Sequence, residues 1–165
     1  ATIAGVAAKK GLDRLLNIDD AQGKLKGLGN STKQIATIMD SALASVKGTA
    51  FGLGDAATVA SNAVAAGIKP GQDLTKYLTL TADAASIAGV SLDEMGSIIN
   101  KTTTSGKVYT DNLNQLADRG IPIFQWLQKE YGVSADELSS MVQKGQVDSA
   151  TGVSYEIGSG DLLEG

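Results

Sequence analysis

The sequence predicts an all-α protein: a compact multi-helix array of roughly seven to nine short helices with sharp, glycine-terminated turns. One turn recurs, in which glycine closes a helix, a β-branched residue packs back on it, and the next residue can open another helix. Strand patterns are nearly absent, and Val153 to Ile157 is the one candidate. The recurring turn is found at Gly67-Ile68-Lys69, Gly89-Val90-Ser91, Gly120-Ile121-Pro122 and Gly132-Val133-Ser134.

The N-terminal region carries leucine and isoleucine at helical spacing. This predicts one helix over about Ile3 to Leu16 and a short one from Ile18 to Leu28, with Asp19 and Asp20 near its start. Ser31 or Thr32 then caps a helix whose apolar residues recur every three or four positions as far as Val46.

Two helices are predicted after the glycine-rich turn from Gly48 to Gly54. Asp55 caps the first, which runs to Ala66 and consists mostly of alanine, valine and small polar residues. Small side chains favour a close-packed helix over a solvated one. Gly71 or Gln72 begins the second, longer helix, with Leu74, Tyr77 and Leu78 on its apolar face.

The second half of the chain has clear helix starts. Ser91 and Glu94 form a predicted capping box, in which the serine side chain binds the N3 backbone and the acid returns to the serine backbone. The polar stretch from Thr102 to Lys107 is predicted to be a loop. Further starts are expected at Thr110, at Pro122, and at Ser134 with Glu137 as a second capping box.

Composition bounds the size and stability of the domain. The 165 residues fit one domain, and 42% of them are apolar but only 4% are aromatic. Small apolar side chains let helices approach closely, yet each contact buries little area. The 20 glycines add to the conformational entropy lost on folding. We therefore expect modest stability.

Charge argues against nucleic-acid binding, because the net charge of −4 provides no basic surface for phosphates. The first 33 residues differ, since lysine and arginine outnumber aspartate there. Such a basic helical segment fits a solvated helix face better than a membrane-binding or nucleic-acid-binding one. Its charged residues are Lys9, Lys10, Arg14, Lys24, Lys26 and Lys33 against Asp13, Asp19 and Asp20.

No residue pattern indicates an enzyme, a cofactor or a metal site. Cysteine and histidine are absent, which removes thiolate nucleophiles, the usual zinc and haem ligands and the side chain that titrates near neutrality. The stretch Gly52 to Ala57 has the glycine spacing of a dinucleotide-binding motif, but no strand precedes it and Asp55 would repel a phosphate. A glycine turn with an aspartate cap explains it better.

The other chemical signals also have structural explanations. The adjacent carboxylates fit the first turns of helices, where the helix dipole favours acids. Neighbouring serine or threonine and lysine residues point to different sides of a helix. The aromatic residues Phe124, Trp126 and Tyr131 could bind a ligand, but we expect them to anchor a small core, which is the commoner role of such a group. The carboxylate pairs are Asp19-Asp20, Asp93-Glu94 and Asp136-Glu137, and the hydroxyl–lysine pairs are Thr32-Lys33 and Ser45-Lys47.

An ordered series of stretches over about residues 10 to 150 resembles the core of the tail tape measure proteins of siphophages and prophages. They form successive small helices separated by glycine and include an Ala-Asp-Arg-Gly-Ile-Pro turn. The stretches are Met39 to Phe51, Leu53 to Ala60, Ala65 to Gly67, Tyr77-Leu78, Ala82 to Ala85, Leu92 to Gly96, Asn114 to Ile123 and Tyr131 to Ser134, followed by Met141 and Gly145.

The resemblance implies a structural role. In this family the tail tube polymerises around an extended, mostly helical chain that sets tail length and is later expelled. The implied partners are the tail tube protein, tail assembly chaperones and other copies of the chain. The implied location is the lumen of the tail tube in the virion, and the host cytoplasm during assembly.

Three regions are expected: a basic helical segment over residues 1–30, the helical tape measure core over 31–150, and a flexible or foreign tail over 151–165 that departs from the family pattern. We also expect the chain to be a piece of a longer protein, because it lacks an initiator methionine and a signal peptide. The alternative function is a membrane-active or effector-docking helical module used during genome injection, with transient membrane contact.

Overall fold

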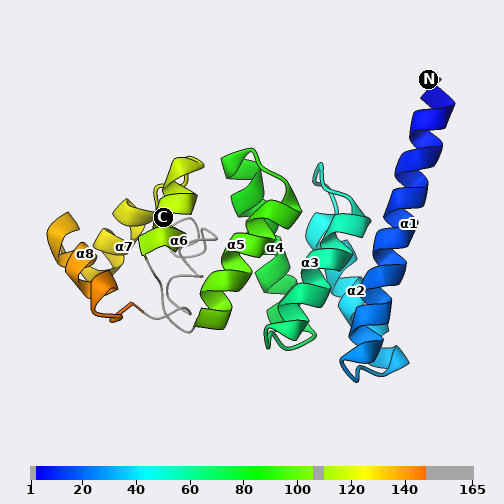
Figure 1. Cartoon of the computed structure of the whole chain (residues 1–165), viewed down its shortest axis with the longest axis horizontal. Coiled ribbons are helices and arrows are strands. Elements are labelled where there is room, and N and C mark those ends of the chain that lie inside the picture. Colours follow the sequence, from blue (N-terminus) through cyan, green and yellow to red (C-terminus); the bar gives the residue numbers. More distant parts are fainter. Residues whose placement is uncertain (1–2, 106–109, 148–165) are drawn as a thin grey trace. The chain divides into compact units, whose positions relative to one another are not determined.

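The computed structural model describes residues 3–105 and 110–147. Over these residues it contains eight α-helices and no strand, which confirms the predicted all-α class (Figure 1). The strand candidate and the tail 151–165 lie outside the described residues. The helices are α1 (Ile3–Gly27), α2 (Thr32–Val46), α3 (Leu53–Ala65), α4 (Gln72–Ala88), α5 (Leu92–Ser105), α6 (Thr110–Asp118), α7 (Ile123–Tyr131) and α8 (Ala135–Gln143).

All four predicted glycine turns are Schellman motifs. Their glycines have φ between 63° and 102°, in the left-handed region that side chains disfavour. In each motif the amide after the glycine donates to the carbonyl five residues earlier, as Ile121 does to Leu116 at 3.1 Å. Two further copies, at Gly29-Asn30 and Gly145-Gln146, have the same bonds. The sequence pattern missed them because a polar residue follows the glycine.

The helices form two compact units, residues 1–82 and 83–165, and the boundary falls within α4. In the first unit α1 and α2 both pack on α3 (Figure 1). The inner side of α3 is made of fully buried alanines, which confirms the close-packed interpretation. They are Ala56, Ala57, Ala60 and Ala63.

Gly54 lies at a close approach between α1 and α3. A Cβ atom at this position would lie 3.2 Å from the Cα atom of Arg14 and 3.3 Å from its carbonyl oxygen. These are backbone atoms, so they cannot turn aside as the end of a flexible side chain could. The absence of a side chain at Gly54 therefore sets how closely α1 lies against α3.

Hydroxyl groups connect α2 to the start of α4. The hydroxyl of Thr75 donates to that of Ser41 at 2.8 Å. The carbonyl oxygen of Gly71 lies within hydrogen-bond distance of both hydroxyls, 3.1 Å from that of Thr75 and 3.4 Å from that of Ser41. Ser41 is buried, so these bonds satisfy a polar group that water could not reach easily. The start predicted at Gly71 or Gln72 is confirmed.

The second unit has an aliphatic core to which α5, α6, α7 and α8 all contribute. The aromatic residues Phe124, Trp126 and Tyr131 are only partly buried, so the expectation that they anchor the core was wrong. Aliphatic residues one helical turn apart fill the interior instead. The buried apolar residues on α5 to α8 are Leu92, Met95, Ile98, Ile99, Leu113, Leu116, Ile123, Leu127, Leu138 and Val142.

Two predicted breaks in helices are wrong. The N-terminal region is one helix, α1, because no glycine turn or cap separates Leu16 from Ile18. The expected loop from Thr102 belongs to α5 as far as Ser105. There the hydroxyls of Thr103, Thr104 and Ser105 donate to carbonyls four residues earlier, so they are satisfied without leaving the helix.

The predicted cap of α3 is also wrong. Gly52 occupies the N-cap position, and Asp55 lies in the first turn of the helix. A carboxylate in the first turn still interacts favourably with the positive end of the helix dipole. Local sequence therefore located the start of α3 to within a turn but assigned the wrong residue to the cap.

Candidate functional site

Three turns of the chain share the sequence glycine, any residue, serine, two residues, then glutamine or glutamate and an apolar residue. Each combines a Schellman glycine with a serine whose hydroxyl accepts a hydrogen bond from the third helical amide. The copies are Gly29 to Ile35, Gly89 to Met95 and Gly132 to Leu138. Each turn satisfies the end of one helix and the start of the next through local bonds.

Two of these turns contain complete capping boxes. The amide of Ser31 donates to the side chain of Gln34 at 2.7 Å, and the amide of Ser134 donates to Glu137 at 3.2 Å. The box predicted at Ser134 is therefore confirmed. Of the two predicted caps for α2, Ser31 is the one present.

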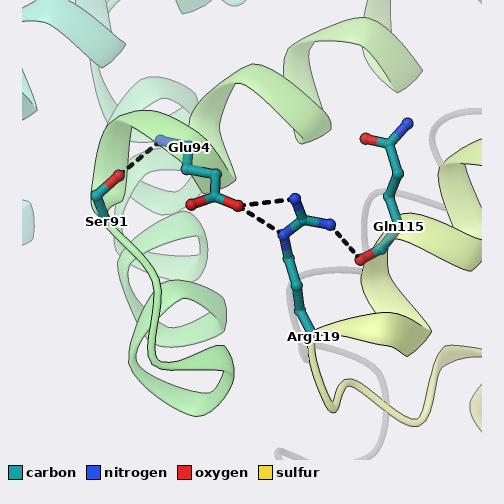
Figure 2. Close-up of polar contacts among 4 residues, drawn as sticks. All are labelled: Ser91, Glu94, Gln115 and Arg119. Carbon is teal, nitrogen blue, oxygen red and sulfur yellow. Dashed lines mark hydrogen bonds and ion pairs between the residues drawn. The ribbon is translucent and has the colours of Figure 1, made fainter.

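The third turn differs because its acid binds elsewhere. Ser91 accepts from the amide of Glu94 at 3.1 Å, but the Glu94 carboxylate turns away to Arg119 (Figure 2). Arg119 donates to the same carboxylate oxygen through Nε at 2.8 Å and Nη2 at 2.7 Å. Its Nη1 donates to the carbonyl of Gln115 at 2.7 Å, within α6. The predicted box at Ser91 is thus half formed, and an ion pair between α5 and the end of α6 replaces its second bond.

The residues considered in the sequence as candidates for chemistry do not come together in one site, or they have structural roles. The carboxylates of all three acidic pairs are exposed, and Asp19 and Asp20 lie in the middle of α1 rather than at a helix start. Ser45 donates to the carbonyl of Ala42 at 2.7 Å, which orients its hydroxyl into its own helix. In the glycine motif, Gly54 faces the backbone of Arg14, so no phosphate could lie against it.

The described part of the second unit contains a small apolar pocket that sequence reasoning missed. It encloses about 110 Å³ among α6, α7 and α8. Buried leucine and valine form its inner wall, and threonine, glutamine and serine stand at its rim. Its lining is Thr110, Leu113, Phe124, Gln128, Ala135, Leu138, Ser139 and Val142. The pocket could not be found from sequence because it needs three helices to meet.

Within residues 3–105 and 110–147, no group of three metal-ligating side chains gathers where it could hold an ion. No helix in this part of the chain has both the length and the apolar character of a membrane span. In the described residues, six of the eight helices end in a Schellman glycine and three begin at an N-cap serine.

The chain belongs to the tape measure protein family. The family model described as "Tape measure protein" matches residues 9–154, which is most of the chain. Comparison with curated proteins and with solved structures gave no match. The family is structural rather than catalytic, and the chain accordingly has a role in phage tail assembly and tail-length determination and is associated with the virion. Nothing in the comparisons supports the membrane-active alternative.

Proposed function

We propose that this chain acts as a row of individually capped helices that separate from one another as the tail assembles and then lie along the lumen of the tail tube. The observation that carries this proposal is the local capping of successive helices. A Schellman glycine and an N-cap serine bond only to residues within the same turn. Those bonds survive when neighbouring helices move apart, so a helix keeps satisfied ends without its tertiary contacts.

The packing in each unit fits this role. Alanine faces and short aliphatic helices bury little area per contact, so separating them costs less than opening a large aromatic core. We also propose that the chain has three regions: the basic segment 1–30, the core 31–150 and the tail 151–165. The expected partners are the tail tube protein around the chain, the tail assembly chaperones before polymerisation, and other copies.

Two in-frame deletions in the phage gene test the ruler function. Removing residues 68–89 joins Gly67 to Val90-Ser91, and removing 90–132 joins Gly89 to Val133-Ser134, so each deletion rebuilds the same glycine turn. With a helical rise of about 1.5 Å per residue, the mean tail should shorten by about 33 Å and about 65 Å. Tail lengths are measured by electron microscopy.

Duplication of residues 68–89 is the matched control and should lengthen the tail by the amount that their deletion removes. Unchanged tail length with lost infectivity would contradict the ruler function and support the membrane-active alternative. Dye release from liposomes by the purified chain would also support the membrane-active alternative. Equal shortening by both deletions would also contradict it, since length must follow residue number.

A further inference from the structure

The ion pair between Glu94 and Arg119 joins α5 to the end of α6 through side chains that water can still reach. The exposed fraction of the side chain is 44% for Glu94 and 29% for Arg119. An ion pair at this level of exposure contributes little free energy, and salt weakens it. The contact can therefore break and re-form without moving a charge out of a fully buried site.

The start of α5 offers the Glu94 carboxylate a second hydrogen-bond donor. Within the described part of the chain, the amide of Ser91 has no hydrogen-bond partner, and Ser91 is exposed. The hydroxyl of Ser91 accepts from the amide of Glu94 at 3.1 Å, so half of the capping box is already in place (Figure 2). Gln34 and Glu137 each accept from the amide of their own N-cap serine. Rotation of the Glu94 side chain toward Ser91 would complete the box in the same way.

Arg119 has a local role that does not depend on Glu94. Its backbone amide donates to the carbonyl of Leu116 at 3.1 Å, which leaves the carbonyl of Gln115, near the end of α6, to another donor. The guanidinium supplies that donor through Nη1, at 2.7 Å (Figure 2). The Arg119 side chain thus satisfies the end of its own helix with one nitrogen and binds Glu94 with the other two.

We propose that the Glu94–Arg119 pair is a salt-sensitive latch whose two halves act as helix caps when it opens. With α5 packed on α6, the Glu94 carboxylate binds Arg119. When the two helices part, the carboxylate turns back to the amide of Ser91, and Arg119 keeps its bond to Gln115. This inference rests on the proposed separation of helices during tail assembly. It names a junction where separation loses one ion pair but gains one hydrogen bond.

Hydrogen exchange of backbone amides in the whole purified chain, measured by NMR, tests the latch. Arg119→Gln removes the charge that holds Glu94. The amide of Ser91 should then exchange roughly two- to tenfold more slowly than in the wild-type chain, as expected for one added hydrogen bond. Lys101→Gln is the matched control, since it removes an exposed cation from α5, and it should leave the Ser91 rate unchanged.

Two further variants identify the group that accepts the bond. Glu94→Gln should also slow exchange at Ser91, because a neutral side chain no longer attracts Arg119, and Gln34 shows that glutamine can complete a capping box. The double variant Glu94→Ala/Arg119→Gln has no side chain to accept the bond. Exchange at Ser91 should therefore return to the wild-type rate.

The wild-type chain tests the salt dependence without any substitution. Raising NaCl from about 0.05 M to about 0.5 M should slow exchange at Ser91, because salt screens the ion pair and releases Glu94. The amides of Ser31 and Ser134 are internal controls, since their capping boxes are complete, and they should keep their exchange rates.

Three results would overturn the inference. These are equal exchange at Ser91 in Arg119→Gln and the wild-type chain, slow exchange that persists in the double variant, and wild-type exchange at Ser91 that salt does not change. Circular dichroism of each variant establishes that its helices are intact. Because the measurement follows one amide of the purified chain in solution, it fails or succeeds independently of the tail-length deletions.

Discussion

Arg119 binds the carboxylate of Glu94 across the space between the end of α6 and the start of α5, with Nη2 and Oε1 2.7 Å apart. In the other two turns, the side chains of Gln34 and Glu137 accept a hydrogen bond from the backbone amide of their own N-cap serine. At Glu94 the ion pair with Arg119 takes the place of that bond. The same local sequence thus has two outcomes, and a residue 25 positions away selects between them.

Replacing Arg119 and replacing Glu94 should lower the free energy of unfolding by different amounts. Arg119→Ala loses the pair but frees Glu94 to return to the amide of Ser91, so we expect a loss of less than about 1 kcal/mol in the free energy of unfolding. Glu94→Ala loses both possibilities and should cost more. Urea unfolding of both variants and of the double variant gives the coupling energy. An equal loss in the two single variants would contradict the proposed rescue by the capping box.

Gly54→Ala should destabilise the first unit even though alanine is the better helix former. The gain in helix propensity is about 1 kcal/mol, whereas pushing a methyl group against the Arg14 backbone costs about 1–3 kcal/mol. Gly23→Ala is the matched control, since nothing lies within 4 Å of its added Cβ and only the propensity gain remains. We expect opposite signs for the two variants in urea unfolding.

Gly132→Ala should cost about 1–2 kcal/mol, because Gly132 has φ of 63° and a side chain is strained in the left-handed region. No atom lies within 4 Å of the added Cβ, so conformational strain alone would account for the loss. Gly132→Asn should cost less, since asparagine tolerates this conformation. Equal unfolding free energies for the alanine and asparagine variants would show that the backbone conformation is not what glycine supplies here.

Ser134→Ala should remove about 1 kcal/mol, because the hydroxyl of Ser134 satisfies the amide of Glu137 at the start of a short helix. Ser139→Ala, at an exposed position within α8, should have a small stabilising effect instead. Thermal unfolding followed by circular dichroism compares the two. If both variants melt at the same temperature, the cap contributes nothing.

The sequence by itself determined the helical class and most helix ends. Glycine at Gly67, Gly89, Gly120 and Gly132 and serine at Ser31 and Ser134 act through bonds to residues within a turn or two, so their effect can be inferred without knowing the rest of the fold. It also determined the family through the order of those short helices.

Only the tertiary structure decided what depends on residues distant in the chain. Glu94 leaves its capping box for Arg119, Gly54 lies against the backbone of Arg14, and Leu113, Phe124 and Leu138 meet around the pocket. Each outcome requires two or more helices to approach. Their approach is set by the shapes of whole helix faces, which no local pattern of residues specifies.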